Sequence, residues 1–258
     1  MAPKILSFDG QKFNIIPSKL DAYSGWWQSI ASIDIDKNGN NDLVRGNIGE
    51  NFSLKASQEE PLFLWINDFD NNGDVEKLIT RRIDGKDRTV FVKRDLTDQM
   101  PGLKKQNLMH SDFAKRGLID LFPKEILERS VIKKVNHLSS IVVMNDGNGN
   151  FEINKLNPEA QLSSINSILN YDVNKDGFED LVVGGNNEYL LPQFSSIDAC
   201  SGKVLLNDNG KGFKVLEGLA SGLDNAGVVR NIEAIDYGGT PHVLFLINDD
   251  APRLYKVD

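Results

Sequence analysis

The feature that most constrains the fold of this chain is an acidic loop that occurs three times. It reads DIDKNGNNDL at residues 34–43, DFDNNGDVEKL at 68–78 and DVNKDGFEDL at 172–181. In each copy, carboxylates or amides occupy every second position up to a glycine, and another acid follows three residues later. Internal repetition of this kind indicates a fold that is built from similar small units.

A second repeated element is a tight hairpin. It occurs as SFDGQKFNII (7–16), MNDGNGNFEI (144–153) and LNDNGKGFKVL (206–216). Asn, Asp and Gly between apolar strands supply the positive φ angles that short hairpin loops need. A segment at 234–249, AIDYGGTPHVLFLIND, keeps the strands and the turn but lacks the oxygen ligands. Many short antiparallel strands indicate an all-β sandwich, barrel or propeller, and a repeat of about four strands favours the β-propeller.

Residues 103–137 interrupt this pattern with a helical period. The stretches SDFAKRGLIDLF (111–122) and PKEILERSVIKKV (123–135) carry apolar residues at spacings of three to four. We expect two short amphipathic helices that pack on the β body, and a partner-binding helix pair is the alternative.

The sequence thus predicts a single domain over residues 1–258 with a helical insertion at about 103–137. The domain is a β-propeller with about four or five blades, either a complete small ring or a partial arc. In a ring, the strand RLYKV (253–257) would pair with ILSF (5–8) and protect the sheet edges.

The acidic loops have the composition of metal sites. Side-chain oxygens from the first, third and fifth positions meet at one point, and the carbonyl after the glycine adds another oxygen. This donor set suits Ca²⁺, fits Mg²⁺ less well because Mg²⁺ resists dehydration, and disfavours zinc because no His or Cys joins it. An EF-hand would need a bidentate Glu at position 12, where the loops have Arg45, Ile79 and Val183. We therefore expect loops between strands, with an acid at position 9 as the last side-chain ligand.

The pattern resembles the FG-GAP/VCBS repeats of integrin-α-like β-propellers over most of the chain outside the helical insertion. The match is strong at 34–42 and 172–180, good at 68–76, where Glu76 replaces the usual Asp, and fails at Asp236. The phrases GWW before the first loop, GN after it and DACSGKVLLNDNGKGF (198–213) look like the C-terminal propeller of secreted or surface proteins of Bacteroidota-type bacteria.

The resemblance implies two to three structural calcium sites. Their side-chain ligands would be Asp34, Asp36, Asn38 and Asp42; Asp68, Asp70, Asn72 and Glu76; and Asp172, Asn174, Asp176 and Asp180. The backbone carbonyls of Asn40, Asp74 and Phe178 would complete the sites. The alternative is that these are metal-free turns, in which acids and amides are common for local hydrogen bonding. Three converging carboxylates would, however, repel one another without a cation.

Catalytic motifs are weak by comparison. His110, His137 and His242 stand in unrelated contexts, and Cys200 is expected to be a buried thiol because no nucleophile elbow surrounds it. The acids suit metal binding better than the paired-carboxylate role of a glycosidase.

Four polar residues and three tryptophans are candidates for ligand contact. Core packing is the expected role of the tryptophans, which are Trp26 and Trp27 on an expected strand and Trp65, and sugar contact is the alternative. The candidates for the lining of a central channel are Arg45, Asn47, Asn186 and Asn187.

The composition excludes some partners. A net charge of −8 argues against nucleic acid, and no apolar run reaches the roughly 18–20 residues of a membrane span. The start MAPKILSFDG resembles a cut from a longer secreted precursor, so we expect an extracellular, cell-surface or periplasmic location rather than a cytoplasmic one.

The expected function is that of a calcium-stabilised, non-enzymatic binding or adhesion module that recognises protein or glycan through loops on the propeller face. The alternatives are a polysaccharide-degrading lyase or hydrolase with structural calcium, and a purely structural spacer. The fold itself does not choose among them, because propellers carry many activities.

Overall fold

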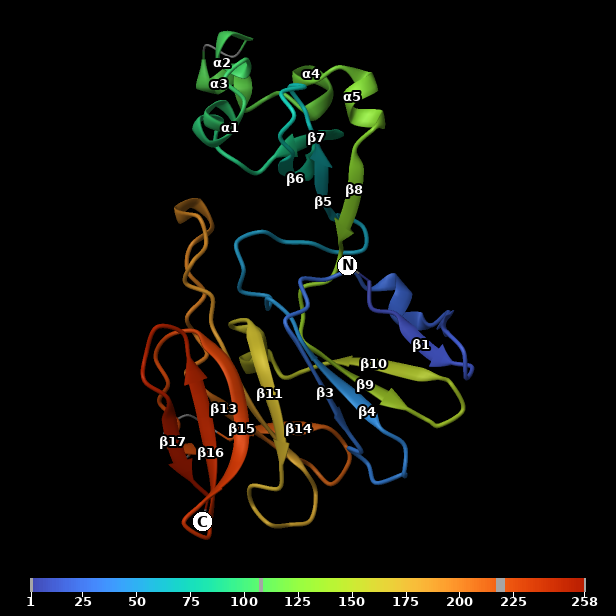
Figure 1. Cartoon of the computed structure of the whole chain (residues 1–258), viewed down its shortest axis with the longest axis vertical. Coiled ribbons are helices and arrows are strands. Elements are labelled where there is room, and N and C mark those ends of the chain that lie inside the picture. The colour runs from blue at the N-terminus through green and yellow to red at the C-terminus, as the bar shows by residue number, and fades with distance from the viewer. Residues whose placement is uncertain (1, 107–108, 217–220, 258) are drawn as a thin grey trace. The chain divides into compact units, whose positions relative to one another are not determined.

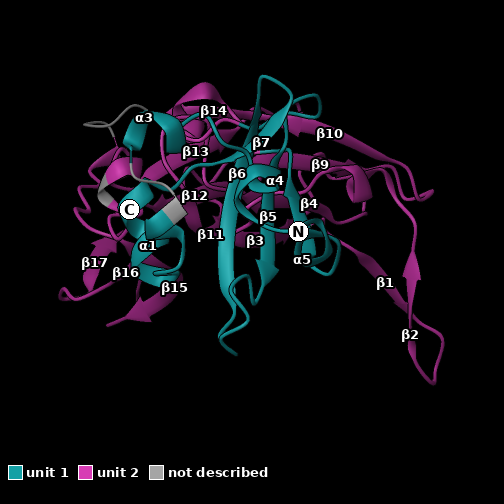
Figure 2. Cartoon of the chain, turned by 90° about the horizontal axis from the view of Figure 1, so that it is seen from above, with its two compact units in different colours: residues 1, 56–137 teal, residues 2–55, 138–258 magenta. Residues whose placement is uncertain are grey.

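The chain forms two compact units. The computed structural model describes residues 2–106, 109–216 and 221–257 (Figure 1). We call residues 56–137 the insert unit, and residues 2–55 and 138–258 the main unit (Figure 2). The chain therefore leaves the main unit after residue 55 and returns to it at residue 138.

Antiparallel strands dominate the main unit. Its strands are β1 (Ile5–Phe8), β2 (Phe13–Ile16), β3 (Ser29–Ile33), β4 (Asp42–Gly46), β9 (Ile141–Asn145), β10 (Phe151–Lys155), β11 (Ile165–Tyr171), β12 (Asp180–Gly185), β13 (Lys203–Asn207), β14 (Phe213–Leu216), β15 (Val229–Tyr237), β16 (Thr240–Ile247) and β17 (Arg253–Lys256). Short 3₁₀ helices are η1 (Lys19–Ala22), η2 (Pro158–Gln161) and η3 (Pro192–Phe194). The predicted hairpins at 7–16, 144–153 and 206–216 are confirmed as β1–β2, β9–β10 and β13–β14.

The strands of the main unit form four sheets. Their orders are β1-β2, β10-β9-β4-β3, β11-β12-β13-β14 and β15-β16-β17, with antiparallel neighbours throughout. The sheet of β3, β4, β9 and β10 follows chain order except that the whole insert unit lies between β4 and β9 in the sequence. An all-β fold with four-stranded antiparallel sheets is thus present.

The predicted pairing of residues 253–257 with 5–8 is wrong. Among the described strands, β17 pairs only with β16, and β1 pairs only with β2. The reason is packing, because Ile5 of β1 lies against the cluster around Leu20, Ile141 and Val143 on the sheet of β3, β4, β9 and β10. The N-terminal hairpin is therefore attached to that sheet rather than to β17.

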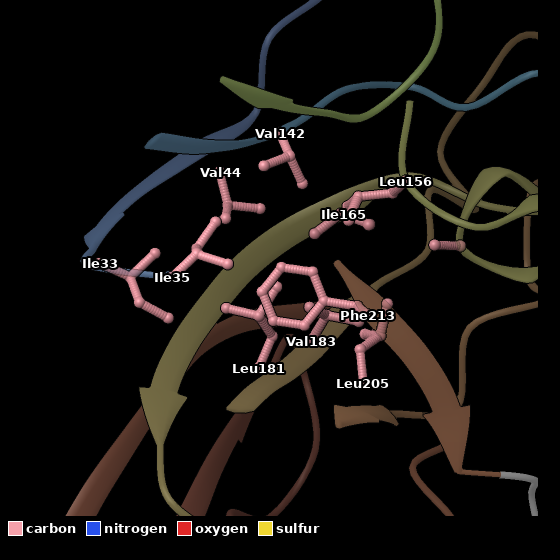
Figure 3. Packing of buried hydrophobic residues seen from close by; sticks show 11 residues of the cluster. Ile33, Ile35, Val44, Val142, Leu156, Ile165, Leu181, Val183, Leu205 and Phe213 are labelled. Atoms are coloured by element: carbon pink, nitrogen blue, oxygen red, sulfur yellow. The ribbon is translucent and has the colours of Figure 1, made fainter. Parts of the chain in front are cut away.

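The middle sheet, β11-β12-β13-β14, is buried on both faces. Leu181 and Val183 of β12 join Ile33 and Val44 in one apolar cluster (Figure 3). Val182, between them, belongs to a second cluster with β15 and β16. Successive side chains of a strand point to opposite faces, so the uninterrupted apolar run LVV is what a strand between two packed sheets requires.

The tryptophans before the first acidic loop do not lie on a strand. Trp26 and Trp27 occupy the irregular segment that precedes β3, which corrects the strand predicted there. The rings of Trp26 and Phe52 are nearly perpendicular, with centroids 5.4 Å apart and an interplanar angle of 79°. Trp27 packs against the Leu20 cluster, as predicted for a core residue, and the Arg45 guanidinium carbon lies 4.2 Å from its ring centroid.

The insert unit has a sheet and a core of its own. The sheet order is β7-β6-β5-β8, with β5 (Leu62–Asn67), β6 (Glu76–Ile83), β7 (Lys86–Thr89) and β8 (Val131–Val135). Its helices are α1 (Lys93–Gln99), α2 (Leu103–Gln106), α3 (His110–Phe113), α4 (Leu118–Leu121) and α5 (Lys124–Glu128). Apolar side chains of the helices pack on Leu78 of β6 and on Phe69 in the loop between β5 and β6. The predicted amphipathic helices therefore pack on a sheet within their own unit.

The helix predicted over 123–135 is too long. It ends at Glu128, and Val131–Val135 form strand β8, in which Ile132 pairs with Trp65 and Val135 pairs with Leu62. Branched Val and Ile side chains favour strands, and the edge of β5 supplies the backbone partners. The spacing of three to four residues alone did not separate these two outcomes.

Candidate metal sites in the acidic loops

Each acidic loop connects the two strands of a hairpin. The loop at 34–42 joins β3 to β4, the loop at 68–76 joins β5 to β6, and the loop at 172–180 joins β11 to β12. The prediction of strands on both sides is therefore confirmed, and the EF-hand, which needs flanking helices, is excluded.

The three loops share one backbone conformation. The residue at position 4 is left-handed in each, with φ of 58° at Lys37, 57° at Asn71 and 61° at Lys175. The glycine at position 6 also has a positive φ, which is 86° at Gly39, 95° at Gly73 and 90° at Gly177. Glycine adopts this region without steric cost, so it makes the sharp turn possible.

The first aspartate organises the turn in the same way in each copy. In the first loop, Asp34 Oδ1 accepts the backbone N–H of Asn38 at 3.1 Å, and its Oδ2 accepts that of Gly39 at 2.9 Å. The equivalent N···O distances are 3.0 and 2.9 Å at Asp68, and 3.1 and 2.9 Å at Asp172. The backbone thus holds the first carboxylate toward the inside of the loop.

The side chain at position 5 is fixed by the backbone at position 7. The N–H of Asn40 donates to Asn38 Oδ1 at 2.8 Å, as the N–H of Asp74 does to Asn72 at 2.7 Å. In the third loop the N–H of Phe178 donates to Asp176 at 2.8 Å. These are the residues whose carbonyls are predicted ligands.

The acid at position 9 is buried and closes the loop. It accepts the N–H of the second loop residue, at 2.9 Å for Asp42, 2.8 Å for Glu76 and 3.0 Å for Asp180. The second oxygen of Asp42 accepts the N–H of Asn145 at 2.7 Å, and that of Asp180 accepts the N–H of Asn207 at 2.8 Å. Both asparagines end the third strand of their sheet.

Sequence reasoning missed these two asparagines as parts of the loops. Asn145 and Asn207 occupy the same place in the hairpin sequences MNDG and LNDN, and this shared ND pair was the available signal. The Asn207 side chain also donates to the carbonyls of Ile35 at 3.0 Å and Glu179 at 3.2 Å. It therefore links the first and third acidic loops.

Two of the loops bring three carboxylates together. Ligand atoms of Asp34, Asp36 and Asp42 lie within 4.8 Å of one another, and so do those of Asp68, Asp70 and Glu76. Each cluster can hold a metal ion. In the third loop the amide of Asn174 takes the place of the third-position acid. Among the described residues, its three acids, Asp172, Asp176 and Asp180, do not come as close together as those of the other two loops, although the loop offers the same number of side-chain oxygens.

Burial makes these carboxylates costly without a cation. Desolvation raises the pKa of the Asp42 carboxyl above its usual range, two backbone N–H donors oppose this, and the negative charges of Asp36 and Asp34 add to the rise. Burial also raises the pKa of Asp180, with Asp176 acting in the same direction. A divalent cation would offset both effects, because a nearby positive charge favours the ionised carboxylate. The donor set, which consists only of oxygen, fits Ca²⁺.

The first and third loops lie side by side in the main unit. Lys37 Nζ lies 3.8 Å from the centroid of the Phe178 ring, a cation–π contact between the two loops. Asp36 also approaches the β13–β14 turn, where a Cβ on Gly210 would lie 2.9 Å from the Asp36 Cα. An interaction that fixes the conformation of the first acidic loop therefore also constrains the third.

The other predicted residues take structural positions. Cys200 is 2% exposed, and burial raises the pKa of its thiol, as expected of a core residue. His242 lies on β16 of the main unit with Nδ1 2.8 Å from the Thr240 carbonyl, whereas His110 and His137 belong to the insert unit. The three histidines are therefore divided between the two units.

Only part of the expected channel lining is near open space. Asn47 is buried and donates from its backbone N–H to Ser140 at 3.0 Å. Asn186 is also buried, and its side chain donates to the Gly227 carbonyl at 3.0 Å. Asn186 and Asn187 are both among the residues that line a hollow of about 240 Å³ at the beginnings of β3, β11 and β15.

Comparisons with known proteins identify no family. No model of a known protein family matches this sequence, and no curated protein is similar to it. Within the described part of the chain, none of the helices combines the length and the apolar character that crossing a membrane requires.

Proposed function

We propose that this protein is a calcium-stabilised binding module of the FG-GAP/VCBS type. The observation that carries the proposal is the shared conformation of the three acidic loops. Loops that are far apart in the sequence use the same hydrogen bonds, the same left-handed positions and the same hairpin location. Metal-free turns need no such agreement in the placement of buried acids.

Calcium would be held by the side chains already described. These are Asp34, Asp36, Asn38 and Asp42; Asp68, Asp70, Asn72 and Glu76; and Asp172, Asn174, Asp176 and Asp180, with the carbonyls of Asn40, Asp74 and Phe178. The ion supplies positive charge among crowded carboxylates and has no part in a reaction. Binding to the folded state alone would stabilise it by about 2.7 kcal/mol per site at a hundredfold excess of calcium.

The sheet packing supports a propeller arc. The meander β11-β12-β13-β14 packs on the sheet of β3, β4, β9 and β10 through one face and on β15 and β16 through the other. A propeller stacks four-stranded sheets face to face in this manner. The extracellular space or cell surface is the proposed location, where calcium is plentiful enough to fill even weak sites.

Recognition, rather than catalysis, is the proposed role of the loops. The buried acids of the clusters are used as hydrogen-bond acceptors within the turns, which leaves them poorly suited to exchange protons with a substrate. Protein or glycan is the proposed ligand class. Binding on a glycan array without product formation would fit this role, and depolymerisation of a bound polysaccharide would overturn it.

Thermal melting with calcium or EGTA tests the metal part of the proposal. At about 2–4 °C per kcal/mol for a chain of this size, one filled site should raise Tm by about 5–10 °C. Asp34→Asn and Asp172→Asn should reduce this rise, whereas Asp9→Asn, in an exposed hairpin turn, should keep it. Equal Tm values in calcium and EGTA would refute metal-supported loops.

A further inference from the structure

A polar hollow of about 240 Å³ opens where the first strands of three sheets begin. It is lined by Gln28 just before β3, Asn166 of β11, Asn186, Asn187 and Tyr189 after β12, and Val228 and Arg230 at the beginning of β15. The acidic loops of β3 and β11 follow the opposite ends of these strands. Asn166 and Asp172 are six residues apart along β11, or about 20 Å at about 3.3 Å per residue.

The lining offers hydrogen-bonding groups that the protein does not use. Gln28 donates through Nε2 to the Trp26 carbonyl at 3.0 Å, and Asn166 donates through Nδ2 to the Asn186 carbonyl at 2.8 Å. Among the described residues, the side-chain oxygens of Gln28 and Asn166 accept no hydrogen bond, and the Asn187 side chain makes none. Carboxamides that donate and accept in this way match the hydroxyl groups of a sugar.

Asn248 holds an aromatic ring and a cation beside these amides. Its Nδ2 donates to the Tyr189 hydroxyl at 3.1 Å, and its Oδ1 accepts from Arg230 Nε at 3.1 Å. The Tyr189 hydroxyl also donates to Asp249 at 3.3 Å. Tyr189 is 65% exposed, although its hydroxyl accepts one hydrogen bond and donates another. An exposed ring held in one orientation is a suitable platform for the apolar face of a pyranose.

Arg230 indicates that the ligand carries a negative charge. The chain has 37 acidic and 29 basic residues, yet none of the described residues that line this hollow is acidic. In the described part of the structure, the two terminal amino groups of Arg230 have no partner. A guanidinium with a fixed Nε and free terminal groups binds a carboxylate through two parallel hydrogen bonds. Asp249 is not among the residues that line the hollow, and its carboxylate accepts hydrogen bonds from the Tyr189 hydroxyl at 3.3 Å and from Asn248 Nδ2 at 2.9 Å.

We propose that this hollow binds one sugar residue that carries a carboxylate, such as a uronic acid unit of an anionic glycan. The volume is below the roughly 300–1,000 Å³ of pockets for drug-sized ligands, which suits a single ring. The inference rests on the proposed function as a binding module, and it assigns the recognition site to the strand ends opposite the acidic loops. Asn248 is then a positioning residue for both Tyr189 and Arg230.

The test is an NMR titration of the calcium-loaded full chain with paired sugars. Glucuronate, galacturonate and mannuronate are each compared with the neutral parent sugar, which has a hydroxymethyl group in place of the carboxylate. At least one uronate should bind with a Kd about tenfold or more below that of its neutral parent, and should shift the amide resonances of Asn187 and Arg230. Arg230→Gln and Tyr189→Ala should each raise that Kd about tenfold.

Matched variants outside the hollow serve as controls. Tyr237→Ala removes a tyrosine of similar exposure, 67%, at the far end of β15, and Arg94→Gln removes an exposed arginine of the insert unit. Both should leave the Kd unchanged. Asn248→Ala should raise the Kd for the uronate while changing Tm little, because Asn248 acts on binding by positioning Tyr189 and Arg230.

Three outcomes would overturn the site. These are the absence of uronate binding, equal affinity for the neutral parents, and binding that is unaffected by Arg230→Gln. The failure is separable from that of the proposed function, because the melting experiment with EGTA reports on the acidic loops alone. Glycan binding that persists in Arg230→Gln would leave the binding module intact and place its site elsewhere.

Discussion

The substitution Asp42→Ala separates the structural role of an acidic-loop carboxylate from its role toward a cation. Asp42 is 0% exposed, and its two oxygens accept the N–H groups of Ile35 at 2.9 Å and Asn145 at 2.7 Å. Alanine leaves both donors without an acceptor. The first bond is buried and the second is partly buried, so water can replace only the second in part.

The expected cost follows from these two bonds. An unsatisfied buried donor costs about 1–3 kcal/mol, so the loss of two acceptors should cost about 2–6 kcal/mol. Partial hydration of the Asn145 N–H and relief of repulsion from Asp34 and Asp36 reduce the expected loss in free energy of unfolding to about 2–4 kcal/mol without metal. In excess calcium, loss of the ion should add about 2.7 kcal/mol. Asp42→Asn keeps one oxygen and should cost less.

Urea unfolding of each variant in calcium and in EGTA measures both contributions. Asp9→Ala is the matched control, because Asp9 accepts backbone N–H groups of Gln11 and Lys12 at 2.9 and 3.0 Å but is exposed and outside the acidic loops. We expect it to cost much less than Asp42→Ala under both conditions, because surface substitutions usually have small effects. If Asp42→Ala costs no more than the control, the hydrogen-bond reasoning is wrong. If its cost is the same in calcium and EGTA, Asp42 does not support a cation site.

Three further predictions concern residues that are not themselves proposed ligands. In urea unfolding, Gly210→Ala should destabilise the fold by about 1 kcal/mol or more beyond Gly239→Ala. Both glycines have a similar φ (80° and 77°), but only at Gly210 does the added Cβ lie within 4 Å of another backbone. Equal costs of the two substitutions would contradict this reasoning. The hydrogen bond from Lys86 lowers the pKa of Asp120, so the stability from this pair is present above about pH 4 and is lost as the pH falls through the folded-state pKa. Lys86→Met should therefore raise the titration midpoint of the Asp120 carboxyl, measured by NMR. Cys200 should react with a thiol reagent only after unfolding in urea, and rapid reaction of the native protein would show that it is accessible.

The hairpins and the acidic loops could be predicted because their signals are local. Asn, Asp and Gly at fixed offsets specify backbone conformations within a few residues, and the structure places Gly39, Gly73 and Gly177 at the same turn position. The same holds for the strands that flank each loop, since the acid at position 9 begins the outgoing strand at Asp42, Glu76 and Asp180.

Long-range pairing could not be predicted from such signals. The helix predicted through Val135 ends early because β5 offers an edge to which Val131–Val135 add, and nothing within 123–135 specifies that edge. The insert unit is another case, since its sheet begins at Leu62, well before the helical period that marked the insertion. Partners that are distant in sequence decided both outcomes.

Close approach of a neighbouring backbone explains the phrase GN after two of the loops. A Cβ on Gly46 would lie 2.1 Å from the Ile165 carbonyl oxygen, and one on Gly185 would lie 1.5 Å from that of Ser164. The following residues, Asn47 and Asn186, are both buried and hydrogen-bonded. The motif was visible in the sequence, but its physical cause lies in the neighbouring strand.

Native mass spectrometry of the calcium-loaded chain tests the central claim most directly, because it counts bound ions. The two carboxylate clusters and the third loop predict two or three calcium ions per chain, with one fewer after Asp34→Ala and no change after Asp9→Ala. A chain that binds no calcium, or that keeps every ion after Asp34→Ala, would contradict the assignment of the acidic loops as cation sites.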